Sequence, residues 1–137
     1  MPGPCLVIID DNPADIELVA IAFELRSIVV ETLTAVDGER GIALLTRLET
    51  QGRVPSLILL DLNMPRITGF DVLEYMRTRA GLASVPVIVF SSSTSPRDRD
   101  RSLALGAREF ISKAVDLQSQ LVIVDRLRPY LAAAARG

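Results

Sequence analysis

The strongest constraint on the fold is a regular alternation of short apolar runs with longer segments of helical spacing. Five runs rich in apolar or β-branched residues are expected to be strands: 5–9, 29–35, 57–60, 87–90 and 109–111. Three of them are almost uninterrupted apolar, as in strands that are buried on both faces. The alternation therefore predicts an α/β domain in which helices cover both faces of a parallel sheet.

The segments between these runs carry helix signals. The first is expected to begin after an Asn12 N-cap with Pro13 as its first residue and Asp15 in its first turn. Its inward face is expected to be Ile16, Val19, Ala20 and Phe23. Further helices are expected at about 38–49, with Ile42, Leu45 and Leu48 inward, and at about 69–79, with Val72, Leu73 and Met76 inward. A fourth begins at a Ser95 cap and ends near residue 105, and Asp116 can cap a fifth.

The fifth helix has an apolar stripe and a proline. At about 100° per residue, the stripe expected to pack on the sheet consists of Leu117, Leu121, Val124, Leu127 and Leu131. Ile123 and Tyr130 lie at its edge, and Val122 points nearly opposite. Pro129 removes one helical hydrogen bond, so we expect a kink or an end to the helix before Tyr130.

Length and charge limit the classes of function. With 137 residues the chain fits one domain, whose core is expected at about 5–131, and no linker long enough to join an output domain is found. A net charge of −2 gives no electrostatic footprint for nucleic acid, so DNA binding is disfavoured. No apolar stretch approaches the roughly 20 residues of a membrane span, and residues 1–4 lack the basic start of a secretory signal. We expect a cytoplasmic protein.

Two residue counts exclude further chemistry. The only cysteine, Cys5, can form no internal disulfide, and its apolar neighbours predict an inert buried thiol. The chain contains no histidine, which rules out histidine acid–base catalysis and histidine-ligated zinc or iron sites.

Polar residues gather where the expected strands end. Asp10 and Asp11 follow the first strand, Asp61 follows the third, Ser91 follows the fourth, and Lys113 follows the fifth. Because ligands bind outside the carboxyl ends of parallel strands, these groups are expected at one edge of the sheet. Clustered carboxylates repel one another unless a cation compensates. Mg²⁺, which prefers one or two carboxylates with phosphate oxygens and retained waters, fits better than Ca²⁺.

Each signal alone has an ordinary explanation. Asp10 and Asp11 ahead of Asn12 and Pro13 could form only a helix-capping turn. Asp61 alone could be a loop residue, the hydroxyls of residues 91–94 a polar loop, and Lys113 a solvated lysine. Chance seldom places an acid pair, an acid, a hydroxyl and a lysine in this order at four strand ends of one short chain.

Longer stretches carry a family resemblance. They are residues 7–12 (VIIDDN), 35–38 (AVDG), 59–65 (LLDLNMP) with Gly69, 86–91 (PVIVFS), and 106–107 (GA) followed by Phe110 and Lys113. With them the chain resembles the response-regulator receivers of two-component signalling from Cys5 to about Leu131. The resemblance implies a single flavodoxin-like receiver domain over 1–137, with a doubly wound five-stranded parallel sheet in the order 2-1-3-4-5 and five helices on both faces.

The resemblance also implies site roles. Asp61 would be the phospho-acceptor that attacks the phosphohistidine of a sensor histidine kinase. Mg²⁺ would be held by Asp11, Asp61 and the backbone carbonyl of Asn63, with Asp10 acting through metal-bound water. The chain would thus be a signalling phospho-acceptor rather than an enzyme, although it assists its own phosphorylation and dephosphorylation.

The implied output is a change of shape. Lys113 would pair with the phosphoryl oxygens, Ser91 would swing inward to donate a hydrogen bond to them, and the Phe110 ring would turn into the vacated space. Asn63 and Ser93 would flank the phosphate. The surface of fourth helix, fifth strand and fifth helix is also expected to form a homodimer through Val122, Ile123 and Tyr130.

Two departures from the usual pattern refine the resemblance. Ala114 follows Lys113 where most receivers have proline, often with a cis bond that orients the lysine. Residues 91–94 (SSST) and 113–117 (KAVDL) are similar to those of single-domain receivers associated with phytochrome histidine kinases.

Three rival functions stay open. A flavodoxin-like electron carrier needs a glycine- and hydroxyl-rich phosphate loop after the first strand, where this chain has Asp10 and Asp11. An aspartyl phosphatase wants a general-acid carboxylate two residues after its nucleophile, where this chain has Asn63. A degenerate receiver would bind a protein partner without phosphorylation, and the intact acids argue against it.

Overall fold

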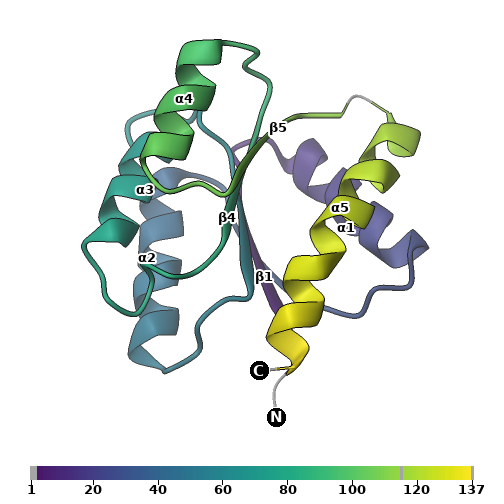
Figure 1. Ribbon diagram of the computed structural model, residues 1–137, viewed down its shortest axis with the longest axis horizontal. Helices are drawn as coiled ribbons and strands as arrows, with labels where there is room; N and C mark the ends of the chain where they lie inside the picture. The colour runs from purple at the N-terminus through teal and green to yellow at the C-terminus, as the bar shows by residue number, and fades with distance from the viewer. Residues whose placement is uncertain (1–2, 115, 137) are drawn as a thin grey trace.

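The structure is a computed structural model that describes residues 3–114 and 116–136 (Figure 1). Strands and helices alternate along the chain. They are β1 Cys5–Ile9, α1 Pro13–Leu25, β2 Glu31–Ala35, α2 Gly38–Thr50, β3 Leu57–Leu60, α3 Gly69–Arg77, β4 Val87–Ser91, α4 Pro96–Ala104, β5 Glu109–Ser112 and α5 Leu117–Arg136. All strand pairs are parallel, and the sheet order is β2-β1-β3-β4-β5. The predicted flavodoxin-like α/β fold is confirmed.

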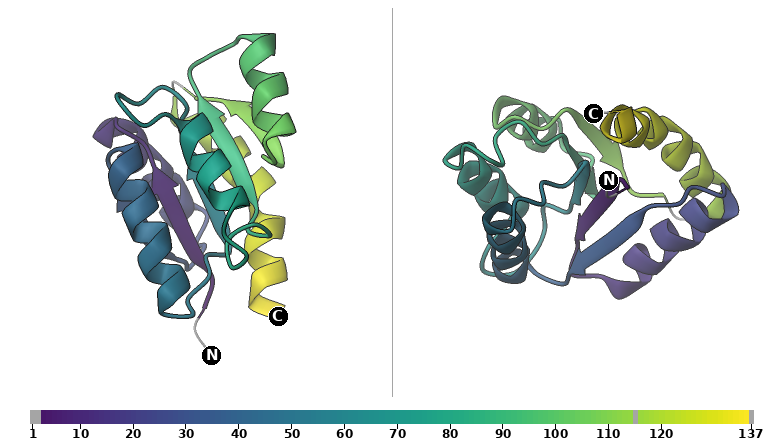
Figure 2. Two further views of the ribbon diagram at one scale, coloured as in Figure 1. Left: turned by 90° about the vertical axis from the view of Figure 1, so that its left-hand side faces the viewer. Right: turned by 90° about the horizontal axis from the view of Figure 1, so that it is seen from below.

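Helices cover the two faces of the sheet in separate groups. Helices α1 and α5 lie side by side on one face, and α2, α3 and α4 lie on the other, as the two views at right angles show (Figures 1 and 2). Successive residues of β1 point to opposite faces. Leu6 and Ile8 therefore pack in the cluster under α1 and α5, while Val7 and Ile9 pack in the cluster under α2 and α3.

Side-chain caps fix the starts of the helices that flank the strand ends. The Asn12 side chain accepts a hydrogen bond of 3.0 Å from the Ala14 N–H and so starts α1 directly after β1. Asp116 accepts a hydrogen bond of 2.7 Å from the Ser119 N–H ahead of α5. The predicted caps at Asn12, Ser95 and Asp116 are confirmed.

Two predicted boundaries or faces were wrong in detail. Strand β2 begins at Glu31 rather than at Val29, because pairing with β1 starts there and the Val29 side chain is 91% exposed. On α1, Ala20 is exposed and Ala22 is buried, so the inward face is rotated toward Ala22 from the predicted stripe. An alanine can occupy either environment at little cost, which makes it a weak marker of a helix face.

Helix α5 differs from the prediction at both ends. It continues through Pro129 instead of ending before Tyr130. Pro129 and Asp125, whose carbonyl loses its helical partner, are both exposed, so water can replace the missing hydrogen bond. Leu117 is exposed rather than packed on the sheet, and Gln120 is buried. The rest of the predicted stripe is buried or half-buried.

None of the helices in the described part of the chain combines the length and the apolar character needed to cross a bilayer.

Candidate functional site

The sheet register brings two of the predicted acids together. Ile9 of β1 pairs with Leu60 of β3, so the next residues, Asp10 and Asp61, leave neighbouring strands at the same edge of the sheet. The loop after β3 returns closely past Asp61 into α3. A Cβ at Gly69, the first residue of α3, would overlap the Asp61 carbonyl oxygen, so only glycine allows this close approach.

The acids form one cluster in two environments. Asp10, Asp11 and Asp61 each offer a carboxylate oxygen within 4.8 Å of the others. Asp10 and Asp61 are 3% and 4% exposed, whereas Asp11 is exposed. Among the described residues, Oδ1 of Asp61 is buried without a hydrogen-bond partner. A buried, unpaired carboxylate oxygen beside two more carboxylates is a donor set that suits a hard divalent cation.

Lys113 supplies the positive charge of the cluster. It follows β5, and its backbone N–H donates to the Ser91 carbonyl at 2.9 Å. Its ammonium nitrogen lies 2.8 Å from Asp15 Oδ2, 2.9 Å from Asp10 Oδ2 and 3.5 Å from Asp61 Oδ2. The predicted meeting of Asp10, Asp61 and Lys113 is thus present, with Asp15 as an additional partner. No cis peptide bond occurs among the described residues, so Ala114 follows Lys113 through a trans bond.

Burial raises the pKa of the two buried carboxylates of the cluster. The pKa of Asp61 is raised to about 6, mainly by burial; the attraction of Lys113 acts to lower it and the nearby Asp10 carboxylate acts to raise it. Burial also raises the pKa of Asp10. Burial lowers the pKa of Lys113, but hydrogen bonds to Asp15 and Asp10 outweigh that effect and raise it above its usual value. Burial raises the pKa of the half-buried Cys5 thiol, in agreement with the predicted low reactivity.

The hydroxyls at the end of β4 and directly after it make different contacts. Ser91 is fully buried, and its Oγ accepts a hydrogen bond of 3.1 Å from the Ser93 N–H. Ser93 was expected to flank the phosphate, but its Oγ donates to Asp98 at 2.7 Å. The hydroxyl-bearing residues that line the cleft over the acids are instead Ser92, Thr94 and Ser112.

An open cleft of about 750 Å³ lies over the acid cluster. Its walls come from the ends of β1, β3, β4 and β5 and from the first turns of α1. The lining residues are Asp11, Asn12, Ala14, Asp15, Leu18, Asp61, Asn63, Ser92, Thr94, Ser112, Lys113 and Ala114. Sequence reasoning noted Asp15 only as a first-turn acid of a helix. Its position one helical turn after the acid pair is the signal that could have placed it in the site.

The predicted switch and interface residues lie outside this cleft. Phe110 of β5 is half-buried against the cluster that includes Val89. On α5, Val122 is 61% exposed, while Ile123 and Tyr130 are half-buried. The Tyr130 hydroxyl donates a hydrogen bond of 2.6 Å to Glu109, so part of this residue is used within the chain.

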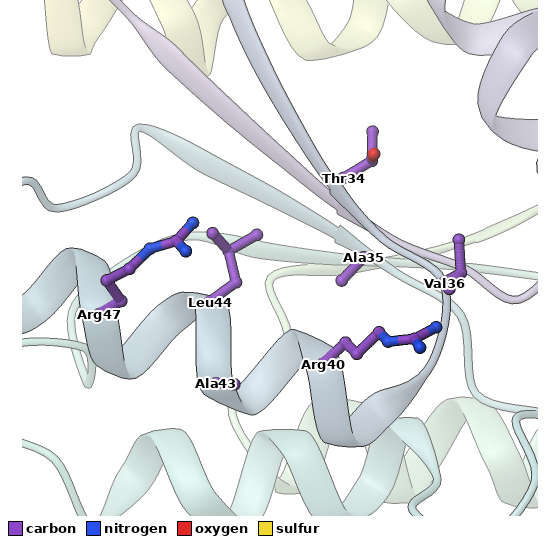
Figure 3. Close-up of a pocket in the computed structure, with 7 residues that line it drawn as sticks. All are labelled: Thr34, Ala35, Val36, Arg40, Ala43, Leu44 and Arg47. Carbon is purple, nitrogen blue, oxygen red and sulfur yellow. The ribbon is translucent and has the colours of Figure 1, made fainter.

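A second hollow, of about 330 Å³, lies between the edge strand β2 and α2. Figure 3 shows Arg40 and Arg47 rising from α2 along this hollow, with Arg40 extending toward Val36. Thr34, Ala35, Ala43 and Leu44 complete the lining. This hollow shares no lining residue with the cleft over the acids. Among the residues that the structure describes, its lining includes two arginines and no acid.

A comparison of the whole sequence with known protein families agrees with the order of these groups at the strand ends. The family model of the response regulator receiver domain matches residues 6–125. The chain belongs to the response regulator receiver family. The resemblance inferred from the acid pair, Asp61 and Lys113 is therefore confirmed at the level of the family.

Solved receiver structures resemble the whole chain. The phosphorylated cyanobacterial phytochrome response regulator RcpA is 30% identical, with a TM-score of 0.85 over 97% of this chain and 96% of that one. The Mn²⁺-bound form of response regulator Rcp1 is 28% identical, with a TM-score of 0.79 over 91% of each chain. The predicted resemblance to receivers associated with phytochromes is thus confirmed.

A curated relative is longer than this chain. The DNA-binding dual master transcriptional regulator RpaA of Synechocystis is 34% identical over 124 residues. The match covers 90% of this receiver and 48% of RpaA, so the chain spans about half the length of that relative.

Proposed function

We propose that this receiver accepts a phosphoryl group on Asp61 from the phosphohistidine of a sensor histidine kinase, with Mg²⁺ bound beside it. One observation carries the proposal. Oδ1 of Asp61 is buried without a hydrogen-bond partner among the described residues, while Asp10, Asp11 and Lys113 surround the same carboxylate. A buried acceptor without a hydrogen bond costs folding free energy. A ligand or a new covalent bond at this oxygen would account for its retention.

The chemistry is a transfer between two nucleophiles. An Asp61 carboxylate oxygen forms a bond to phosphorus as the bond from phosphorus to the histidine nitrogen breaks, which leaves an acyl phosphate and a free imidazole. The attacking carboxylate must be ionised, and with a pKa of about 6 it is mostly ionised at neutral pH. The cleft above it is open to an incoming side chain. Lys113, 3.5 Å from Asp61, stands where it can pair with the phosphoryl oxygens.

The metal ligands proposed are Asp11, Asp61 and the backbone carbonyl of Asn63, with Asp10 acting through water. Asp11 and Asn63 are exposed and line the cleft, whereas Asp10 is buried and already pairs with Lys113 at 2.9 Å. Bound Mg²⁺ would neutralise charge on the acceptor and phosphoryl oxygens. The Mn²⁺-bound form of Rcp1 supports a divalent cation in this family.

The proposed output passes through β4 and β5. Ser91 would donate to the phosphoryl group, and Phe110 would turn inward and change the surface of α4, β5 and α5. We further propose a homodimer on that surface through Val122, Ile123 and Tyr130. The description of RcpA as a cyanobacterial phytochrome response regulator favours a phytochrome as the partner kinase.

The test is labelling with acetyl phosphate. The wild-type protein with Mg²⁺ should gain the mass of one phosphoryl group, and Asp61→Asn should gain none because an amide is a poor nucleophile. EDTA should also prevent labelling. Asp100→Asn is the matched control, because Asp100 is an exposed acid of α4 and its variant should label like the wild type. Stoichiometric labelling of Asp61→Asn would overturn the proposal.

A further inference from the structure

Lys113 is shared by three carboxylates, and the acceptor is the farthest of them. Its ammonium lies 2.8 Å from Asp15 and 2.9 Å from Asp10, but 3.5 Å from Asp61. Asp15 belongs to the first turn of α1, whereas the other two acids follow strands. The Lys113 and Asp15 side chains are 11% and 24% exposed, so solvent screens this ion pair only in part. The ammonium is therefore drawn toward α1 and away from the acceptor.

The contact with Asp15 is not needed to place Lys113 in the site. The backbone of Lys113 is fixed by its hydrogen bond to the Ser91 carbonyl at the end of the sheet. Asp10, whose side chain is 4% exposed, supplies a second and more buried counter-charge. With the backbone and Asp10 both holding the residue, the main effect of Asp15 is on where the ammonium directs its charge.

A lysine ammonium has three N–H donors. Two of them are occupied by Asp15 and Asp10, at distances typical of strong charge-assisted hydrogen bonds. The separation of 3.5 Å from Asp61 is longer than such a bond. A phosphoryl group on Asp61 brings up to two negative charges to the same ammonium. The closer the ammonium moves to those oxygens, the more its contact with Asp15 must lengthen.

We propose that Asp15 competes with the phosphoryl group for Lys113 and so lowers the affinity of the site for that group. This inference rests on the proposed phosphorylation of Asp61. In it Asp15 is a positioning residue, since it acts on the phosphoryl group only through Lys113. The carboxylate at this place on α1 sets how tightly the site holds its phosphoryl group.

The experiment titrates the Mg²⁺-loaded protein with beryllofluoride, a stable mimic of an aspartyl-bound phosphoryl group, and follows the bound ligand by ¹⁹F NMR. Asp15→Asn keeps the size of the side chain and removes its charge. We expect it to tighten beryllofluoride binding by about three- to tenfold, as for the loss of one partly screened competing ion pair. Asp15→Glu retains a carboxylate and should stay within about twofold of the wild type.

Glu17→Gln is the matched control. It removes one negative charge from the same helix at an exposed residue, and it should leave the affinity unchanged. Damage to the fold would weaken binding, so tighter binding cannot come from damage. Unchanged or weaker binding by Asp15→Asn, or equal tightening by Glu17→Gln, would overturn the inference. A wild type that fails to bind beryllofluoride with Mg²⁺ would overturn the proposed function itself, and the inference with it.

Discussion

The Ser93 hydroxyl donates a 2.7 Å hydrogen bond to a carboxylate oxygen of Asp98, in the first turn of α4. Ser93 also accepts from the Ser95 N–H at 3.2 Å, and its own N–H donates to the Ser91 hydroxyl. A continuous chain of hydrogen bonds therefore runs from Ser91, at the end of β4, to the start of α4. Movement of Ser91 toward a phosphoryl group would break the first link of that chain.

Ser93→Ala should loosen the start of α4. The substitution removes both hydrogen bonds of the hydroxyl, so the free energy of unfolding should fall by about 0.5–1.5 kcal/mol. Amide hydrogen exchange of Ser95 and of residues 97–99 should accelerate, while that of α2 should not. Ser92→Ala serves as the control, because the Ser92 hydroxyl lines the cleft. Equal acceleration in both variants would show that the link to Asp98 does not hold α4.

The raised pKa of Asp61 predicts a pH-dependent penalty on folding of the metal-free protein. The pKa is 3.8 for the free side chain and about 6 in the folded state, so the folded state holds the proton more tightly. The stability that this provides is present below pH 4 and is lost as pH rises through 6.

Asp61→Asn should therefore stabilise the metal-free protein at pH 7, by about 1–3 kcal/mol, and the gain should vanish near pH 4. Urea unfolding in EDTA at both pH values measures this difference. Asp100→Asn, at an exposed acid, should change little at either pH. A stabilisation of Asp61→Asn that grows toward low pH would contradict the assignment of the penalty to Asp61.

The strand ends could be predicted from sequence because they depend on local pattern. The apolar runs ahead of Asp10, Asp61 and Lys113 predict parallel strands whose ends bring these residues to one edge of the sheet, whereas the order of the strands came from the family resemblance. The position of Asp15 one helical turn after the acid pair could have placed it near the site, but its contact with Lys113 depends on how α1 packs at the edge of the sheet, which the local pattern does not report. The same limit applies to the first turn of α5, where Leu117 is exposed and Gln120 is buried, so the apolar pattern does not report burial there.

Asp11 and Asp10 should differ in their effect on Mg²⁺ affinity. Asp11 is exposed and free to ligate, whereas Asp10 is buried, pairs with Lys113 and accepts a hydrogen bond of 2.9 Å from the Asn12 N–H. Asp11→Asn should weaken Mg²⁺ binding by about tenfold or more, as expected for a direct ligand, and Asp10→Asn should weaken it less. Calorimetric titration measures both affinities. Equal losses would mean that the two acids do not divide the roles in this way.

The proposed homodimer should depend on Val122. It is 61% exposed on α5, next to a hollow lined by Ile111, Ala114 and Ile123. Val122→Glu would place a charge in the proposed apolar contact and should shift the protein to monomer in light scattering, with and without beryllofluoride. Val29→Glu is the matched control, because Val29 is 91% exposed and precedes β2 on the opposite edge of the sheet. A wild type that stays monomeric at high concentration would exclude this interface.

The central claim is that Asp61, and no other acid of the cluster, carries the phosphoryl group. Borohydride reduces an aspartyl phosphate to homoserine, which marks the modified residue in a peptide map. After labelling with acetyl phosphate and Mg²⁺, we predict homoserine at position 61 and unmodified Asp10, Asp11 and Asp15. Homoserine at one of those three positions, or at none, would contradict the account.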